Sequence, residues 1–212
     1  MLYKQKGNFQ KVVRWIGGNW MTANGATAGG VLFILLTAAS FYLGLTVASL
    51  RWLLCLVPVF LVLRMVMNTL DGMLSREHGT ATVAGELLNE TLDVVGDTVC
   101  YGVLLFVPDA PVLAVTLLLL LIWMAEFFGV LGKSFPGGIR RHETFLGGKP
   151  DRAIWISILA LLLYFVPGFA KHIDQYLLVM CLFVLLTSAI RVRKILAAAK
   201  GKKYESYTWI GR

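Results

Sequence analysis

Two segments of the sequence place acidic, amide and basic side chains at spacings that could bind a cation or transfer a proton. The first, NTLDGMLSREHG, covers residues 68–79, and the second, GELLNETLDVVGD, covers residues 85–97. Both segments adjoin or lie within long apolar stretches. Ionisable side chains inside a membrane are energetically expensive and usually serve a function. The two segments are therefore the first candidates for a functional site.

The polar residues of each segment would share one face of a helix. At 100° per residue, four polar residues from position 64 to position 75 fall within about 60° of arc, and five from position 86 to position 97 fall within about 100°. The first stripe consists of Arg64, Asn68, Asp71 and Ser75, and the second of Glu86, Asn89, Glu90, Asp93 and Asp97. Carboxylates on one stripe repel one another, so the second stripe must face protein, water or cations.

A divalent metal ion would stabilise such a stripe. The alternative is a polar seam hydrogen-bonded within a helix bundle, but ordinary seams use Ser, Thr or an isolated Asn and rarely carry so many acids. All the ligands would be oxygen atoms, and there is no Cys and His cluster. This donor chemistry favours Mg²⁺ or Mn²⁺ over Zn²⁺, with Ca²⁺ as an alternative.

The elements that position these stripes are predicted to be membrane helices. Hydrophobic types make up 58% of the 212 residues, and the mean hydropathy is +0.73. Residues 28–47 carry no charge, and about 20 apolar residues suffice to cross the hydrocarbon core. We expect an all-α integral membrane protein whose residues 1–212 form a single membrane domain, with six transmembrane helices between residues 26 and 197. The predicted spans are 26–47, 52–75, 82–107, 111–131, 152–169 and 175–191.

The distribution of basic residues predicts the orientation. With the N-terminus in the cytoplasm, all of the 20 Lys and Arg residues except Arg51 and Lys171 fall on the inner side. Both termini and the 76–82 and 132–152 loops should therefore be cytoplasmic, with the polar stripes opening to the cytoplasmic face of the inner membrane. Anionic lipid headgroups explain the net charge of +8 more simply than nucleic acid does.

The two ends of the chain are predicted to lie at the membrane surface. Residues 2–20 mix basic and aromatic side chains, which indicates an interfacial amphipathic helix. Either Thr22 or Asn24 could cap the N-terminus of the first span. Residues 198–212 are polar and aromatic and form a predicted cytoplasmic tail.

With spacing included, residues 68–93 read N-x2-D-G-x2-S-R-x8-G-x3-N-x3-D. This pattern resembles the signature of the CDP-alcohol phosphotransferase (CDP-alcohol phosphatidyltransferase) family, D-x2-D-G-x2-A-R-x8-G-x3-D-x3-D. Every spacing matches, and Asn68, Ser75 and Asn89 are the departures. TANGAT at residues 22–27 is similar to the family's T-P-N-x2-T segment, with Ala in place of Pro.

The resemblance implies the six-helix fold of that family and its chemistry. Members transfer a substituted phosphate from a CDP-linked donor, in prokaryotes commonly CDP-diacylglycerol, to an alcohol acceptor and release CMP. They are typically homodimers that use Mg²⁺ or Mn²⁺.

The family's site roles carry over to matching positions of this chain. The metal positions map to Asn68, Asp71 and Asn89, together with Asp93, which is also the proposed general base. The nucleotide-binding part maps to Gly72, Ser75, Arg76 and Gly85, the last at a close approach of two helices.

Basic residues at the inner span ends could bind an acceptor, phosphorylated or not. Anchoring to the inner membrane surface is an equally good interpretation of each. The candidates are Lys133, Arg152, Arg191 and Arg193. Glu126, the only charge in the fourth span, could position a substrate or pair with an inner Arg, and the sequence does not separate these two roles.

The two asparagines remove two negative charges from the expected metal site. Glu86, Glu90 or Asp97 could compensate, because each lies three or four residues from a motif position. The leading hypothesis is thus a working enzyme with an altered metal site. The alternatives are an inactive relative that binds CDP-lipids and a small cation-coupled transporter.

Overall fold

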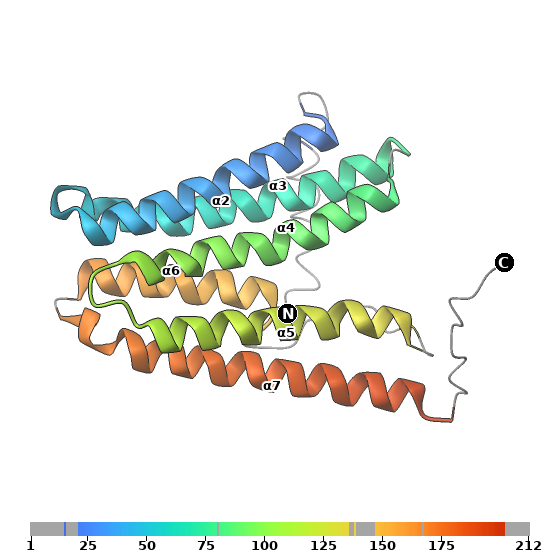
Figure 1. Cartoon of the computed structure of the whole chain (residues 1–212). Helices are drawn as coiled ribbons and strands as arrows, with labels where there is room; N and C mark the ends of the chain where they lie inside the picture. The colour runs from blue at the N-terminus through green and yellow to red at the C-terminus, as the bar shows by residue number, and fades with distance from the viewer. Residues whose placement is uncertain are drawn as a thin grey trace.

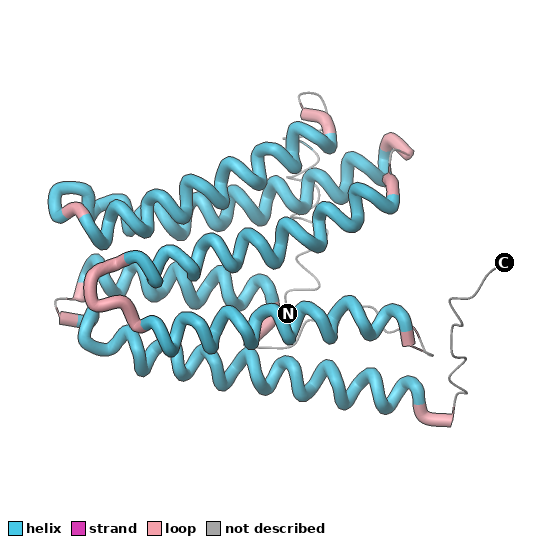
Figure 2. Tube along the Cα trace, in the orientation of Figure 1, coloured by secondary structure: helices cyan, strands magenta, loops and turns pink. Residues whose placement is uncertain are grey.

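The computed structural model of the chain describes residues 15, 21–79, 81–135, 138, 147–166 and 168–201. Every regular element within this part of the chain is helical, and it contains no strand (Figure 2). The predicted interfacial helix over residues 2–20, apart from Trp15, and the tail beyond Gly201 lie outside the described residues.

Six long α-helices make up most of the described chain, and they pack side by side with their axes roughly aligned (Figure 1). Short 3₁₀ segments, Ala48–Leu56, Val103–Phe106 and Phe169–His172, lie at the turns between them. The long helices are α2 (Ala23–Thr46), α3 (Val57–Glu77), α4 (Val83–Gly102), α5 (Val112–Ser134), α6 (Lys149–Phe165) and α7 (Ile173–Ala199). Each of these helices overlaps one predicted apolar run. The ends agree to within five residues, except that α7 continues eight residues beyond the predicted end at residue 191.

Successive helices point in opposite directions, so both polar segments lie at one end of the bundle. The turn between α3 and α4 is at the same end as the start of α2 and the ends of α5 and α7 (Figure 1). The α6 helix also begins on this side. The orientation predicted from the basic residues makes this end the cytoplasmic one.

Local sequence signals explain where the helices begin. The Thr22 hydroxyl accepts a hydrogen bond of 3.1 Å from the Gly25 N–H and caps α2, which settles the choice between Thr22 and Asn24. Thr82 caps α4 in the same way, at 3.0 Å from the Gly85 N–H. Such caps satisfy N–H groups that have no partner within the helix.

Among the residues that the structure describes, four segments are long and apolar enough to cross a membrane: α2, α5 and the stretches Ala48–Arg76 and Phe169–Ala199. Their outer surfaces expose large apolar side chains, such as Leu120 at 64%, as expected of lipid-facing helices. The other two helices differ for physical reasons. The α4 helix carries the acidic stripe, and α6 has only 17 residues, about 26 Å. The chain is an all-α integral membrane protein, and its six-span count stays a prediction.

Close helix packing supports the polar face of α3. A Cβ atom on Gly96 of α4 would lie 2.5 Å from Nη2 of Arg64 and 2.7 Å from Cδ1 of Ile34. Arg64 is therefore laid directly across the α4 backbone. On α2, a Cβ atom on Gly30 would lie 3.0 Å from Oδ1 of Asn68. Glycine at these positions lets the three helices approach closely.

Replacing Gly96 with Ala should destabilise the bundle, because the added methyl group displaces Arg64 and Ile34. Overpacking of this kind costs about 1–3 kcal/mol. The thermal midpoint of the purified protein in detergent should fall. Gly102→Ala, on the same helix, is the matched control, since a Cβ atom on Gly102 meets no described atom within 4 Å. Equal midpoints for both variants would contradict the packing described here.

Candidate active site

The predicted polar faces of α3 and α4 meet. The Asn68 side-chain amide donates a hydrogen bond of 3.1 Å to Oδ1 of Asp93. Nη2 of Arg64 donates to the main-chain oxygen of Asp93 at 3.3 Å and lies 4.0 Å from its Oδ1. Motif positions on two different helices are thus in direct contact, as their shared faces predict.

A threonine from α2 holds the second acid of the motif. The Thr27 hydroxyl donates a hydrogen bond of 2.7 Å to Oδ2 of Asp71. Thr27 is the last residue of the TANGAT segment, whose first residue, Thr22, caps the same helix. The cap and the contact with Asp71 give both threonines of this segment a role in building the site.

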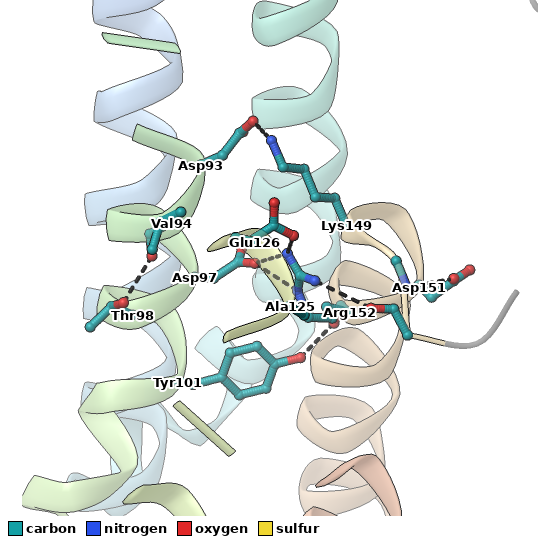
Figure 3. A network of polar contacts seen from close by, with 12 residues as sticks. Asp93, Val94, Asp97, Thr98, Tyr101, Ala125, Glu126, Lys149, Asp151 and Arg152 are labelled. Carbon is teal, nitrogen blue, oxygen red and sulfur yellow. Dashed lines mark hydrogen bonds and ion pairs between the residues drawn. The ribbon is translucent and has the colours of Figure 1, made fainter. Parts of the chain in front are cut away.

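Lys149, the first residue of α6, reaches the acidic stripe of α4. Its Nζ contacts Oδ2 of Asp93 (Figure 3). It also lies 3.6 Å from Oε2 of Glu90. Both carboxylate oxygens of Asp93 are therefore engaged, one by Lys149 and one by Asn68. Burial lowers the pKa of Lys149 to about 8, and the Glu90 carboxylate opposes this shift. The side chain remains a cation at neutral pH.

The remaining shallow acids of α4 pair with a lysine of α5. Nζ of Lys133 lies 3.0 Å from Oε1 of Glu86 and 3.4 Å from Oε1 of Glu90. The Glu86 and Lys133 side chains are 69% and 34% exposed, more than the 24% of Lys149 at Asp93. Exposed pairs of this kind contribute little to stability.

Deeper in the bundle, five charged residues from five helices form what we call the buried ion network. Arg152 donates from Nε to Oδ2 of Asp97 and from Nη2 to Oε1 of Glu126, both at 2.8 Å (Figure 3). Arg64 donates to Oδ1 of Asp97 at 3.1 Å, and Nη1 of Arg191 lies 3.6 Å from Oε1 of Glu126. Arg152 and Glu126 are only 1% and 2% exposed. Glu126 thus pairs with arginines, one of the two roles that the sequence left open.

Two contacts between α6 and α4 run in parallel. Lys149 and Arg152 are three residues apart on α6, and their partners Asp93 and Asp97 are four apart on α4. These spacings place Lys149 and Arg152 on one face of α6, and Asp93 and Asp97 on one face of α4. The Tyr101 hydroxyl also donates a hydrogen bond of 2.6 Å to the main-chain oxygen of Arg152. These contacts fix the start of α6 against α4.

Basic side chains therefore match the acidic stripe. Among the residues that the structure describes, five acids of this region contact five basic residues. The acids are Glu86, Glu90, Asp93, Asp97 and Glu126, and the bases are Arg64, Lys133, Lys149, Arg152 and Arg191. Because its carboxylates repel one another, the stripe was expected to face protein, water or cations. It faces cationic side chains of the protein itself.

The donor set does not fit a divalent metal ion in this arrangement. Asp93 is engaged through both oxygens, and Asp71 accepts from Thr27. The acids proposed to compensate for Asn68 and Asn89 are all paired with lysine or arginine. Within the described part of the chain, no three His, Cys, Asp or Glu side chains form a group that could hold a metal. Asn89 is half-buried on α4, one turn before Asp93.

The predicted nucleotide-binding residues lie near the C-terminal end of α3 and at the start of α4. The Arg76 guanidinium folds back beside Gly72, since a Cβ atom there would lie 3.5 Å from Nη2 of Arg76. Arg76 is exposed and Ser75 is half-buried. The expectation that Gly85 marks a close approach of two helices is wrong. Among the described residues, a Cβ atom on Gly85 would meet only Thr82, the capping residue of the same helix, because Gly85 is exposed in the first turn of α4.

The acceptor candidates have different surroundings. Arg152 and Arg191 are 1% and 3% exposed and belong to the buried ion network, so neither presents a free guanidinium at a surface. Lys133 is paired with Glu86 and Glu90. Arg193 is exposed and lines an apolar groove between α5 and α7.

Two contact residues have weak sequence signals. Lys149 looked like one more inner basic residue, and only its place before Pro150 at a helix start distinguishes it. Thr27 stood in a recognised segment without an assigned partner. Their roles depend on helices that are distant in the chain.

Comparison with known proteins agrees with this architecture. The chain is 33% identical over 199 residues to the inner membrane protein YnbA of Escherichia coli (strain K12), and the match covers 92% of the chain and 96% of that protein. The chain belongs to the YnbA family. No protein-family model matches it.

The fold is also found in a solved structure. The chain is similar to Mycobacterium tuberculosis phosphatidylinositol phosphate synthase (PgsA1), crystallised with CDP-DAG bound, with a TM-score of 0.70 and 16% identity. The match covers 93% of this chain and 98% of that chain. This YnbA relative therefore has the CDP-alcohol phosphotransferase fold that the motif implied.

Glu126→Gln should strongly destabilise the protein, because it leaves the buried Arg152 and Arg191 short of negative charge. Breaking a buried ion pair costs about 3–5 kcal/mol. Glu86→Gln makes the same chemical change at an exposed pair and should cost less than about 1 kcal/mol. Unfolding measured by circular dichroism in detergent compares the two. Similar losses would show that the network does not hold the helices together.

Proposed function

We propose that this protein binds a CDP-linked lipid, most simply CDP-diacylglycerol, and transfers its phosphatidyl group to an alcohol with release of CMP. The observation that carries the proposal is the contact between the two halves of the motif, through Asn68 and Asp93, on a phosphatidyltransferase-like fold. Support also comes from the similarity to a synthase crystallised with CDP-DAG.

The inner end of α3 suits the phosphorylated head of such a lipid. Gly72 leaves the helix surface without a side chain, and the exposed Arg76 beside it can donate paired hydrogen bonds to a phosphate. The acyl chains would lie along the exposed apolar helices. The proposal includes the inner-membrane location, cytoplasmic termini, cytoplasm-facing site and homodimer that the sequence predicts; the E. coli relative's name supports the location.

The chemistry is a displacement at phosphorus. The acceptor hydroxyl oxygen forms a bond to the phosphatidyl phosphorus, and the bond from that phosphorus to the bridging oxygen of the diphosphate breaks. CMP leaves with the electron pair, and Asp93 takes the hydroxyl proton as general base. Asp93 becomes available when Lys149 turns from it toward the diphosphate. No step uses a metal ion, because the neighbouring acids are paired with basic side chains.

Binding of a CDP-linked lipid without turnover is the second candidate. It is favoured by the two asparagines at motif positions and by the full engagement of the Asp93 carboxylate. The two candidates share the ligand and differ in whether CMP is released.

An assay of CMP release separates them. Purified protein in lipid nanodiscs would receive labelled CDP-diacylglycerol and paired acceptors, with and without phosphate, and the lipid product would be identified. Asp93→Asn should lower the rate by about 10²-fold or more, because an amide cannot accept the proton.

The control is Asp174→Asn, the same change at an exposed position in the first turn of α7, where the rate should be unchanged. Equal rates for Asp93→Asn and the unaltered protein would contradict the assigned base. Retained binding of the lipid with no CMP release from any acceptor would favour the second candidate.

A further inference from the structure

The cation of this site is part of the protein chain. We infer that the Lys149 ammonium replaces a divalent metal ion as the positive charge that receives the diphosphate. This inference rests on the proposed function for the identity of the ligand. It departs from the sequence-based prediction of Mg²⁺ or Mn²⁺ and follows from the contacts of α6 with α4.

The first support is the position of Lys149. Its Nζ contacts one oxygen of Asp93 (Figure 3). It also lies 3.6 Å from Glu90, while Asn68 donates to the other oxygen of Asp93. A metal ion bound by Asp93 would have to displace one of these groups. Arg64, 4.0 Å from Oδ1 of Asp93, adds a further positive charge on the same carboxylate.

The second support is the charge of the motif. Asn68 and Asn89 stand where the family pattern has acids, so Asp71 and Asp93 are the only carboxylates at its four acidic positions. A site with half the negative charge requires less positive charge for balance. A single ammonium meets that requirement, whereas a divalent ion beside Lys149 would be repelled. The asparagines and the lysine contact are therefore consistent with each other.

The third support is that the other acids cannot easily be recruited. Glu86 and Glu90 contact Lys133, and Asp97 lies between Arg64 and Arg152 in the buried ion network. Moving Asp97 toward a metal would leave arginines buried without their partner, which is expensive. The same network holds the start of α6 in place, so Lys149 is kept near Asp93.

An ammonium group can perform the required task. Lysine presents a compact charge with three N–H donors on a flexible stem, and it can move from one oxygen acceptor to another. In the structure Lys149 pairs with Asp93. When the diphosphate is present, its oxygens compete for the ammonium, and Asp93 is released as the base. Binding of the nucleotide should then need no divalent metal.

Metal binding tests the inference without reference to activity. Mn²⁺ alone would be titrated into the full-length protein in detergent and followed by electron paramagnetic resonance. The unaltered protein should show no saturable site. The triple variant Asn68→Asp, Asn89→Asp, Lys149→Met restores the acids and removes the ammonium, and it should gain a saturable Mn²⁺ site.

Two further variants keep the metal titration interpretable. Lys133→Met removes a lysine that contacts the same acidic stripe but not Asp93, and should gain no Mn²⁺ site. Lys149→Met alone changes one residue and should be tested beside the triple variant, in case the latter does not fold. Saturable Mn²⁺ binding to the unaltered protein that is lost in Asp71→Asn and Asp93→Asn would overturn the inference.

Calorimetry with CDP separates this inference from the proposed function. Affinity for CDP should be equal in EDTA and in Mg²⁺, and Lys149→Met should lower it in EDTA. CDP binding that requires Mg²⁺ would overturn the inference and leave the proposed function standing. No binding of CDP or CDP-diacylglycerol under either condition would instead refute the proposed function, while the Mn²⁺ titration would still decide which cation the site holds.

Discussion

The structure depends on pairing the buried positive charge of Arg152 with carboxylates. Its guanidinium is 1% exposed and lies between Asp97 of α4 and Glu126 of α5, which in turn contact Arg64 of α3 and Arg191 of α7. An uncompensated charge at this depth would cost several kcal/mol. The five helices that contribute these groups must therefore converge at one point. Apolar surfaces alone would let them slide or rotate, but matched charges in a low-dielectric interior specify one arrangement.

This network also determines the geometry of the shallower site. Because Lys149 and Asp93 lie one helical turn from Arg152 and Asp97, anchoring the deep pair aligns the outer one. The division between the two layers is physical. The deep charges are closed off from solvent and hold helices together, while the shallower ones are more exposed and can exchange partners. A chemical site built on the shallow layer is thus held in place by the deep layer.

The chain has the fold of the mycobacterial synthase at only 16% identity. Little sequence identity is needed to keep six apolar helices in this arrangement, because any lipid-compatible side chain serves on the outer surfaces. Specific residues are needed only where backbones touch, as at Gly30 and Gly96, and where charges are buried. The site can change its charge balance without loss of the fold, which is how we interpret the asparagines of this YnbA relative and its lysine contact.

The sequence by itself determined the helical membrane fold, the positions of the six long helices, and which polar side chains share a face. Most helix ends were predicted to within five residues, whereas α7 ends eight residues beyond its predicted span. These properties depend on local composition and on the 3.6-residue period, so they can be predicted from one chain. Sequence spacing also placed Asn68 and Asp93 each on a polar stripe of its helix. Only the tertiary structure decided what each acid faces. Lys149 meets Asp93, Thr27 meets Asp71 and Arg152 is buried, because these partners come from helices far apart in the chain. For the same reason, Gly85 proved to be a residue in a capped first turn and not a contact between helices.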